Sequence, residues 1–96
     1  VIVRLAHKGI IKKALIDTCH FKGNYPDTFV LEGCVSEPDD LSNANWTTII
    51  DRTKLEADKE HQYEVVAHNL QPSTHVRLSI FPDGGVSRMR LWGTIA

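Results

Sequence analysis

Apolar and polar side chains alternate along most of the chain, which is the pattern of strands that are buried on one face. The clearest case is residues 75–81, where Val76, Leu78 and Ile80 alternate with polar side chains. The same period predicts six further strands, at residues 1–5, 10–18, 29–34, 46–51, 62–67 and 87–92. The pattern therefore predicts an all-β protein with seven short strands.

Turn-forming residues separate these segments. A turn is expected at His7-Lys8-Gly9, and polar breaks are expected at 36–45 and 71–74. Pro82-Asp83-Gly84-Gly85 predicts a tight hairpin, because Asp-Gly and Gly-Gly tolerate positive φ. The one plausible helical fragment, near Thr53 to Lys59, is too short to form a stable helix. Short strands joined by polar turns predict a β-sandwich or jelly roll.

Length and charge narrow the classes of function. The chain has 96 residues, which suits one domain, and its 11 basic and 12 acidic side chains leave a net charge of −1. This balance argues against nucleic acid or an anionic membrane as partner. No apolar run approaches the roughly 20 residues that span a bilayer. The chain starts directly in the strand-like run Val1-Ile2-Val3, so we expect a piece of a longer protein.

The segment DTCHFKGNYPD, residues 17–27, holds more chemistry than a connection needs. Gly23 permits close approach of a ligand and Pro26 stiffens the chain. Its four polar functions are the imidazole of His20, the ammonium of Lys22, the amide of Asn24 and the carboxylate of Asp27. A stiff loop with these groups can hold an anionic or hydrogen-bonding ligand. In the alternative, the same side chains only cap turns or are solvated.

A second group of polar residues flanks the predicted hairpin at 82–85. His75 and Arg77 share a face of one strand, and Arg88 and Arg90 share a face of the next, so a hairpin would bring them together. Arginines on one face suit a carboxylate, because the guanidinium fork binds it bidentately. In the alternative, the arginines pair with acidic side chains of the chain itself, namely Glu32, Glu64 or Asp17. By itself, Asp83 is more typical of a turn than of a catalyst.

Other chemistry has little support in the sequence. His61 and His68 lack the spacing of metal ligands, and Cys19 and Cys34 match neither a CxxC pair nor a zinc knuckle. No serine lies in a nucleophile-elbow pattern.

The two polar blocks, taken together, resemble the allantoicase family. The resemblance lies in Ile16–Asp27, in Trp46-Thr47-Thr48-Ile49 and in Thr74 through Gly93, and it extends over essentially all 96 residues. It implies a jelly-roll β-sandwich of the galactose-binding-like kind. It also implies that this chain is one repeat of a two-repeat enzyme, more similar to the second. A segment upstream of the first strand, rich in Asp, Trp, Glu and Arg in the family's pattern, is absent, so we expect a single repeat over 1–96 that is truncated at its N-terminus.

The resemblance further implies hydrolysis of allantoate to ureidoglycolate and urea in purine breakdown, inside the cell, in the cytoplasm or peroxisome. The expected catalytic residues are His20, Asp27 and Asp83. The expected substrate-binding residues are Lys22, Asn24, His75, Arg77 and Arg88. No residue is assigned to a metal and the cofactor stays unknown, although a divalent cation such as manganese is compatible with an oxygen-rich site.

The expected partners are the small-molecule substrate, the second repeat of the same chain and further copies in a homo-oligomer. Two alternatives stay open: a non-catalytic ligand-binding module on the same fold, and a purely structural repeat that supports a catalytic twin.

Overall fold

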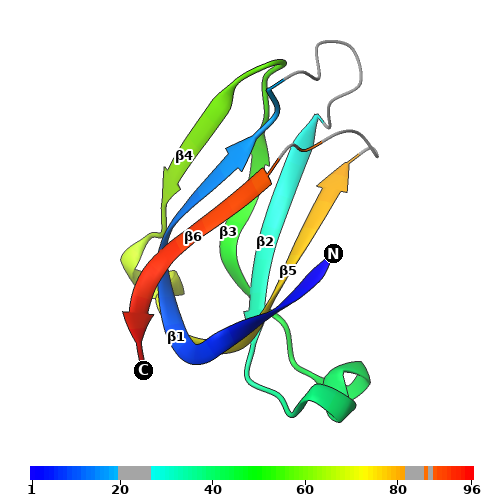
Figure 1. Ribbon diagram of the computed structural model, residues 1–96, viewed down its shortest axis with the longest axis vertical. Helices are drawn as coiled ribbons and strands as arrows, with labels where there is room; N and C mark the ends of the chain where they lie inside the picture. The colour runs from blue at the N-terminus through cyan, green and yellow to red at the C-terminus, as the bar shows by residue number, and fades with distance from the viewer. Residues whose placement is uncertain (20–26, 82–85, 87) are drawn as a thin grey trace.

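The computed structural model describes residues 1–19, 27–81, 86 and 88–96 (Figure 1). Within them, six strands and two short 3-10 helices follow one another: β1 (Ile2–Asp17), β2 (Thr28–Cys34), η1 (Pro38–Asn43), β3 (Thr47–Lys54), β4 (Glu60–Glu64), η2 (Ala67–Asn69), β5 (Pro72–Phe81) and β6 (Arg88–Ile95). Every strand pairing is antiparallel. The all-β prediction is confirmed. The fragment Thr53 to Lys59, judged too short for a stable helix, is not helical: β3 continues to Lys54 and a turn follows, in which Asp58 has a φ of 51°.

The long strand β1 joins the two layers of the fold. One of its edges pairs with β5 as far as Ile10 and then with β4 from Lys13 onwards. Its opposite edge pairs with β6 from Gly9 to Asp17. The sheet order is therefore β3-β2-β5-β1-β4, with β6 also on β1, and the sheet curls into a sandwich (Figure 1).

The turn predicted at His7-Lys8-Gly9 is wrong, because β1 passes through these residues without a break. The pairing with β5 instead shifts register here: from Arg4 to Gly9 β1 advances five residues, while β5 advances only two, from His75 to Ser73. Such an irregularity bends a strand and leaves it continuous. The first two predicted strands are thus one strand, and the part of the chain that the structure describes has six strands where seven were expected.

Two glycines allow β1 and β6 to approach at this bend. A Cβ atom on Gly9 would lie 2.8 Å from the carbonyl oxygen of Thr94. A Cβ atom on Gly93 would overlap the carbonyl oxygen of Ile10 and lie 2.8 Å from its carbonyl carbon. Both obstacles are backbone atoms, so any side chain larger than hydrogen would push the two strands apart.

The hairpin ladder predicted between the last two strands is wrong. In the described residues β6 pairs with β1, from Gly9 to Asp17, and not with β5. The first half of β1 occupies the edge of β5 opposite β2 from Pro72 to Arg77, so only the last residues of β5 are left for a hairpin, whereas β1 offers β6 a longer edge. The turn residues 82–85 themselves lie outside the described residues.

The core lies between the layers and draws on β1, β2, β3 and β5. It consists of Ile11, Ala14, Ile16, Phe29, Leu31, Ile49, Ile50, Leu55 and Val76. Leu78 and Ile80 pack against it, so the apolar face predicted for β5 is confirmed.

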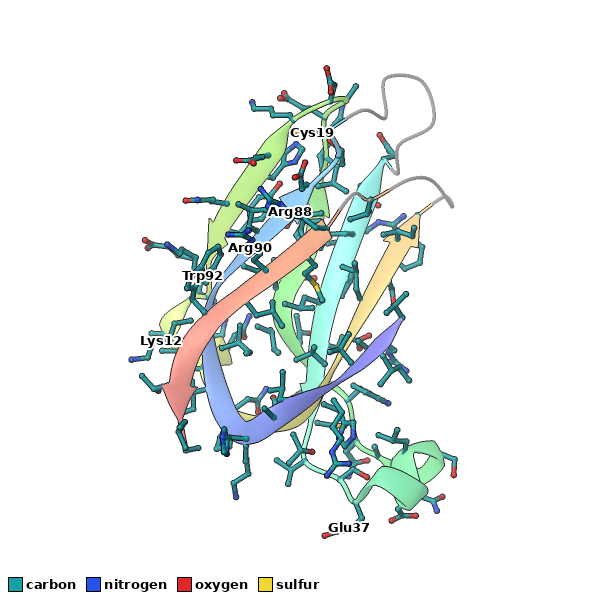
Figure 2. The ribbon with its side chains drawn as sticks, in the orientation of Figure 1. Lys12, Cys19, Glu37, Arg88, Arg90 and Trp92 are labelled. Atoms are coloured by element: carbon teal, nitrogen blue, oxygen red, sulfur yellow. The ribbon has the colours of Figure 1, made fainter. Side chains whose placement is uncertain are left out.

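Three strands end and the other three begin at one end of the sandwich, as their pairing shows. β1, β3 and β5 end, and β2, β4 and β6 begin, at the end marked by Arg88, which we call the Arg88 end. The opposite end, marked by Glu37 in Figure 2, carries η1, and we call it the Glu37 end. In the part of the chain that the structure describes, no helix is long and apolar enough to cross a bilayer.

Candidate functional site

The sequence-predicted site residues fall into three groups. Four of them lie outside the described residues: His20, Lys22, Asn24 and Asp83. Asp27 and Arg88 lie at the Arg88 end, where β2 and β6 begin. Arg77 lies in the middle of β5, and His75 pairs with Cys34 at the other end of β2, towards the Glu37 end.

The described residues that flank the two polar segments meet at the Arg88 end. Thr28, just after the first segment, pairs with Phe81, just before the second, and the Asp27 N–H donates to the Phe81 carbonyl at 3.1 Å. On the other side of both segments, Asp17 pairs with Arg88. The two segments therefore leave and rejoin the fold at one end, which supports the prediction that they form one site.

An ion-pair cluster crosses the strands β6, β1 and β4 at this end. Arg88 donates from Nε to Oδ2 of Asp17 at 3.0 Å and from Nη2 to Oε1 of Glu60 at 2.9 Å. The Asp17 side chain is only 7% exposed. The alternative pairing of an arginine with Asp17 is thus confirmed. The guanidinium of Arg88 is shared between two carboxylates of the chain, and its substrate-binding role stays a prediction.

Cys19 and Asp17 set each other's protonation at the start of the first polar segment. Hydrogen bonds from the Cys19 thiol and from its backbone N–H, the latter at 2.8 Å, hold the pKa of Asp17 below its ordinary value. The hydrogen bond from the thiol to Asp17, together with burial, raises the pKa of Cys19 to about 11. The thiol therefore stays neutral at physiological pH and is a poor nucleophile.

Thr18 and His61 fasten the connection between β3 and β4 to the Arg88 end. The buried Thr18 hydroxyl donates to the Glu56 carbonyl at 2.7 Å and accepts the Lys59 N–H at 3.1 Å. Nε2 of His61 accepts the Glu56 N–H at 2.9 Å, so Nδ1 carries the proton and donates to the Ile16 carbonyl at 3.1 Å. Both ring nitrogens are occupied, and His61 is a structural residue.

Arg77 and His75 do not join Arg88. Arg77 donates to Oε1 of Glu32 from Nε and Nη2, at 3.1 and 3.0 Å, and its Cζ lies 4.4 Å from the centre of the Trp46 ring. The alternative pairing with Glu32 is confirmed. His75 is 3% exposed and its Nδ1 lies 2.9 Å from the Thr74 hydroxyl.

Two hollows lie at the Glu37 end. One of about 200 Å³ is lined by His75 together with Arg4, Lys8 and Glu37. Another of about 720 Å³ is lined by polar and apolar residues alike, among them Lys8, Glu37, Asp40 and Val35. The second hollow is lined by none of the predicted site residues.

Sequence reasoning missed Arg52, on β3 at the Arg88 end. Its Nε donates to the Thr28 hydroxyl at 2.9 Å, and its Cζ lies 4.4 Å from the centre of the Phe81 ring. No local pattern marks this residue, because Thr28 is 24 positions away in the sequence.

Within the described ranges, no group of three or more His, Cys, Asp or Glu side chains is arranged to hold a metal ion. His20 and Asp83 lie outside these ranges, and a divalent cation stays a prediction from the sequence.

Comparison with known proteins assigns this chain to a family. The family model described as "Allantoicase repeat" matches residues 1–96. The chain is 48% identical to a probable allantoicase of Burkholderia mallei over 98% of its own length and 29% of that protein. It is 47% identical to a probable allantoicase of Schizosaccharomyces pombe, over 97% of the chain and 28% of that protein.

Solved structures give the same result. The crystal structure of allantoicase from Saccharomyces cerevisiae superposes with a TM-score of 0.81 at 36% identity, over 96% of this chain and 26% of that chain. The chain thus spans less than a third of the length of the curated relatives cited above.

Proposed function

Because the chain belongs to the allantoicase repeat family, we propose that it is one repeat of an enzyme that hydrolyses allantoate to ureidoglycolate and urea. The observation that carries the proposal is the match of the family model to residues 1–96. The identity of 48% to a probable allantoicase supports it. The resemblance seen in the two polar blocks is thereby confirmed at the level of the family.

The reaction defines what the site must supply. Allantoate carries a carboxylate and two ureido groups on one carbon. Hydrolysis breaks the bond from that carbon to one ureido nitrogen and forms a bond from the same carbon to the oxygen of water. The departing nitrogen gains a proton as urea leaves, and the attacking water loses one. The site therefore needs a cation for the carboxylate, hydrogen-bonding groups for the ureido oxygens and a residue that transfers protons.

The residues of the Arg88 end and its two polar segments match these needs. We assign proton transfer to His20, whose imidazole changes charge near neutral pH. Asp27 and Asp83 orient that ring, and Lys22 and Asn24 contact the substrate. The pairing of Thr28 with Phe81 and of Asp17 with Arg88, which flank both segments, supports one shared site. His75 and Arg77 lie away from this end and are not part of the assignment.

The proposal extends to the rest of the protein. Because the chain spans 29% of a relative, a second repeat in the same polypeptide is expected to complete the molecule. Assembly into a homo-oligomer and a location in the cytoplasm or peroxisome belong to the same proposal.

The test measures urea release from allantoate by the full-length protein that carries this repeat. The wild type is expected to release one urea per ureidoglycolate. His20→Ala is expected to lower kcat by roughly 10²- to 10⁴-fold, the usual contribution of a general acid or base. His68→Ala is the matched control, because His68 is exposed on η2. Binding of allantoate without urea release would identify a binding module, and a wild-type kcat in His20→Ala would refute the role of His20.

A further inference from the structure

The arginines of the sandwich differ in what already occupies their guanidinium groups. Arg77 is occupied by Glu32, and Arg88 is occupied by both Asp17 and Glu60. Arg52 makes no ion pair with any carboxylate in the described part of the chain. It is exposed on β3, two positions before the end of the strand.

Arg52 is nevertheless held in one orientation. Its Nε donates to the Thr28 hydroxyl at 2.9 Å, and its guanidinium stacks on Phe81 with Cζ 4.4 Å from the ring centre. The hydrogen bond is at Nε and the aromatic ring lies against one face, and no hydrogen bond from residues 1–19, 27–81, 86 or 88–96 occupies the edge formed by Nη1 and Nη2. That edge presents two parallel N–H groups, which is the geometry that binds a carboxylate bidentately. Because the group is already oriented, less conformational entropy is lost when a ligand binds.

The position of Arg52 connects it with the proposed site. Thr28 directly follows Asp27 at the end of the first polar segment, and Phe81 directly precedes the second. Backbone hydrogen bonds tie these residues together, from Asp27 N–H to the Phe81 carbonyl at 3.1 Å and from Leu55 N–H to the Asp27 carbonyl at 2.8 Å. The guanidinium therefore lies where both segments join the sandwich.

We propose that Arg52 binds the carboxylate of the substrate at the Arg88 end, with Thr28 and Phe81 as the residues that position it. This inference rests on the proposed function and names the cation that the reaction requires. The ligand class is a small carboxylic acid whose remaining polar groups are ureido groups, and the carboxylate is the part that Arg52 recognises.

The test compares two ligands in the full-length enzyme: allantoate, and its primary amide, which lacks only the negative charge, as an inhibitor. Arg52→Gln is expected to raise KM for allantoate by roughly 10- to 100-fold, the usual effect of losing charged hydrogen bonds. Its effect on the inhibition constant of the amide is expected to stay below about twofold, because a neutral amide gains little from the guanidinium. Arg52→Lys keeps the charge but loses the fork, and is expected to fall between the wild type and Arg52→Gln.

Two further variants complete the design. Thr28→Val removes the acceptor for Nε at nearly constant shape, and is expected to raise KM severalfold with the amide again unaffected. Arg4→Gln makes the same change of charge at an exposed position of β1, beside a hollow at the Glu37 end, and is expected to leave both constants unchanged.

A KM within about twofold of wild type in Arg52→Gln would overturn the inference. Equal weakening of allantoate and the amide would also overturn it, because that result indicates a general loss of structure. If Arg52→Gln does not fold, the same comparison in Arg52→Lys and Thr28→Val decides. If the wild type releases no urea, the proposed function fails, and calorimetric titration with allantoate and the amide then tests Arg52 separately.

Discussion

The shared hydrogen bond between Asp17 and Cys19 shows how single residues at the Arg88 end are tuned by their neighbours. The thiol donates to the carboxylate, which lowers the pKa of Asp17 and raises that of Cys19 to about 11. Arg88 also stabilises the charged form of Asp17. A cysteine directly before the proposed catalytic segment is thus kept neutral, which leaves proton transfer to other groups such as His20.

This pairing predicts a pH dependence for alkylation of Cys19 by iodoacetamide, followed by peptide mass spectrometry. The thiolate is the reactive form, so the wild-type rate should reach half of its maximum only at a pH of about 11. Asp17→Asn removes the charged acceptor, so the profile should shift to lower pH and the rate at pH 9 should increase by more than about tenfold. Glu64→Gln, an equal change of charge on β4, is the control. Identical profiles in the two variants would contradict the assignment.

At the scale of elements, alternation predicted strand positions well and strand partners poorly. The segment 75–81 lies within β5 as expected, because its apolar side chains had one face to bury. The hairpin with β6 failed because pairing depends on which edges are unoccupied: the first half of β1 takes one edge of β5 from Pro72 to Arg77, and β6 pairs along β1 instead. The turn at His7-Lys8-Gly9 failed for a related reason: the glycine serves the contact with β6 inside a continuous strand.

At the candidate site, too, the sequence predicted some features and missed those that depend on strand pairing. The pairing of Arg77 with Glu32 and of Arg88 with Asp17 was foreseen as an alternative, since complementary charges on strands are few enough to enumerate. The sequence does not single out Arg52, because its orientation depends on contact with Phe81, which lies on another strand. Sequence patterns identify which side chains can bind a carboxylate. The register of the sheet decides which of them are already paired with acidic side chains of the chain.

The bend of β1 gives a prediction for Gly93. A Cβ atom there would overlap the backbone of Ile10, so Gly93→Ala should destabilise the repeat by about 1–3 kcal/mol, as overpacking usually does. Urea unfolding of the full-length protein, followed by tryptophan fluorescence, measures this effect. Thr94→Ala, at the neighbouring exposed position of β6, should cost well under about 1 kcal/mol. Equal costs for the two variants would show that the two backbones are not in tight contact.

At the scale of the whole molecule, the repeat presents one wall of the proposed site. The described Arg88 end offers an exposed arginine and an ion-pair cluster. The chain covers only 29% of a probable allantoicase, so most of the relative's mass lies outside it. A site built at the end of a small sandwich needs further walls to exclude water and hold a substrate.

We therefore expect residues 1–96 alone to hydrolyse allantoate at least about 100-fold more slowly than the full-length protein, because the positioning groups of the remaining walls are absent. Urea release by both proteins at equal concentration measures this difference. A far-ultraviolet circular dichroism spectrum typical of β-structure is the control for folding. Turnover by the folded fragment at the full-length rate would show that one repeat is sufficient.

The double role of β1 has a consequence for how the protein is made. All three strands that pair with β1 follow it in the chain, and 78 positions separate Asp17 from Ile95. At about 5–20 residues per second, a ribosome needs roughly 4–16 s to add those residues. During this interval the core residues Ile11, Ala14 and Ile16 of β1 have been made, while the strands that pair with β1 are still being added. We therefore expect the nascent repeat to expose apolar surface that chaperones can bind until β6 is available to pair with β1.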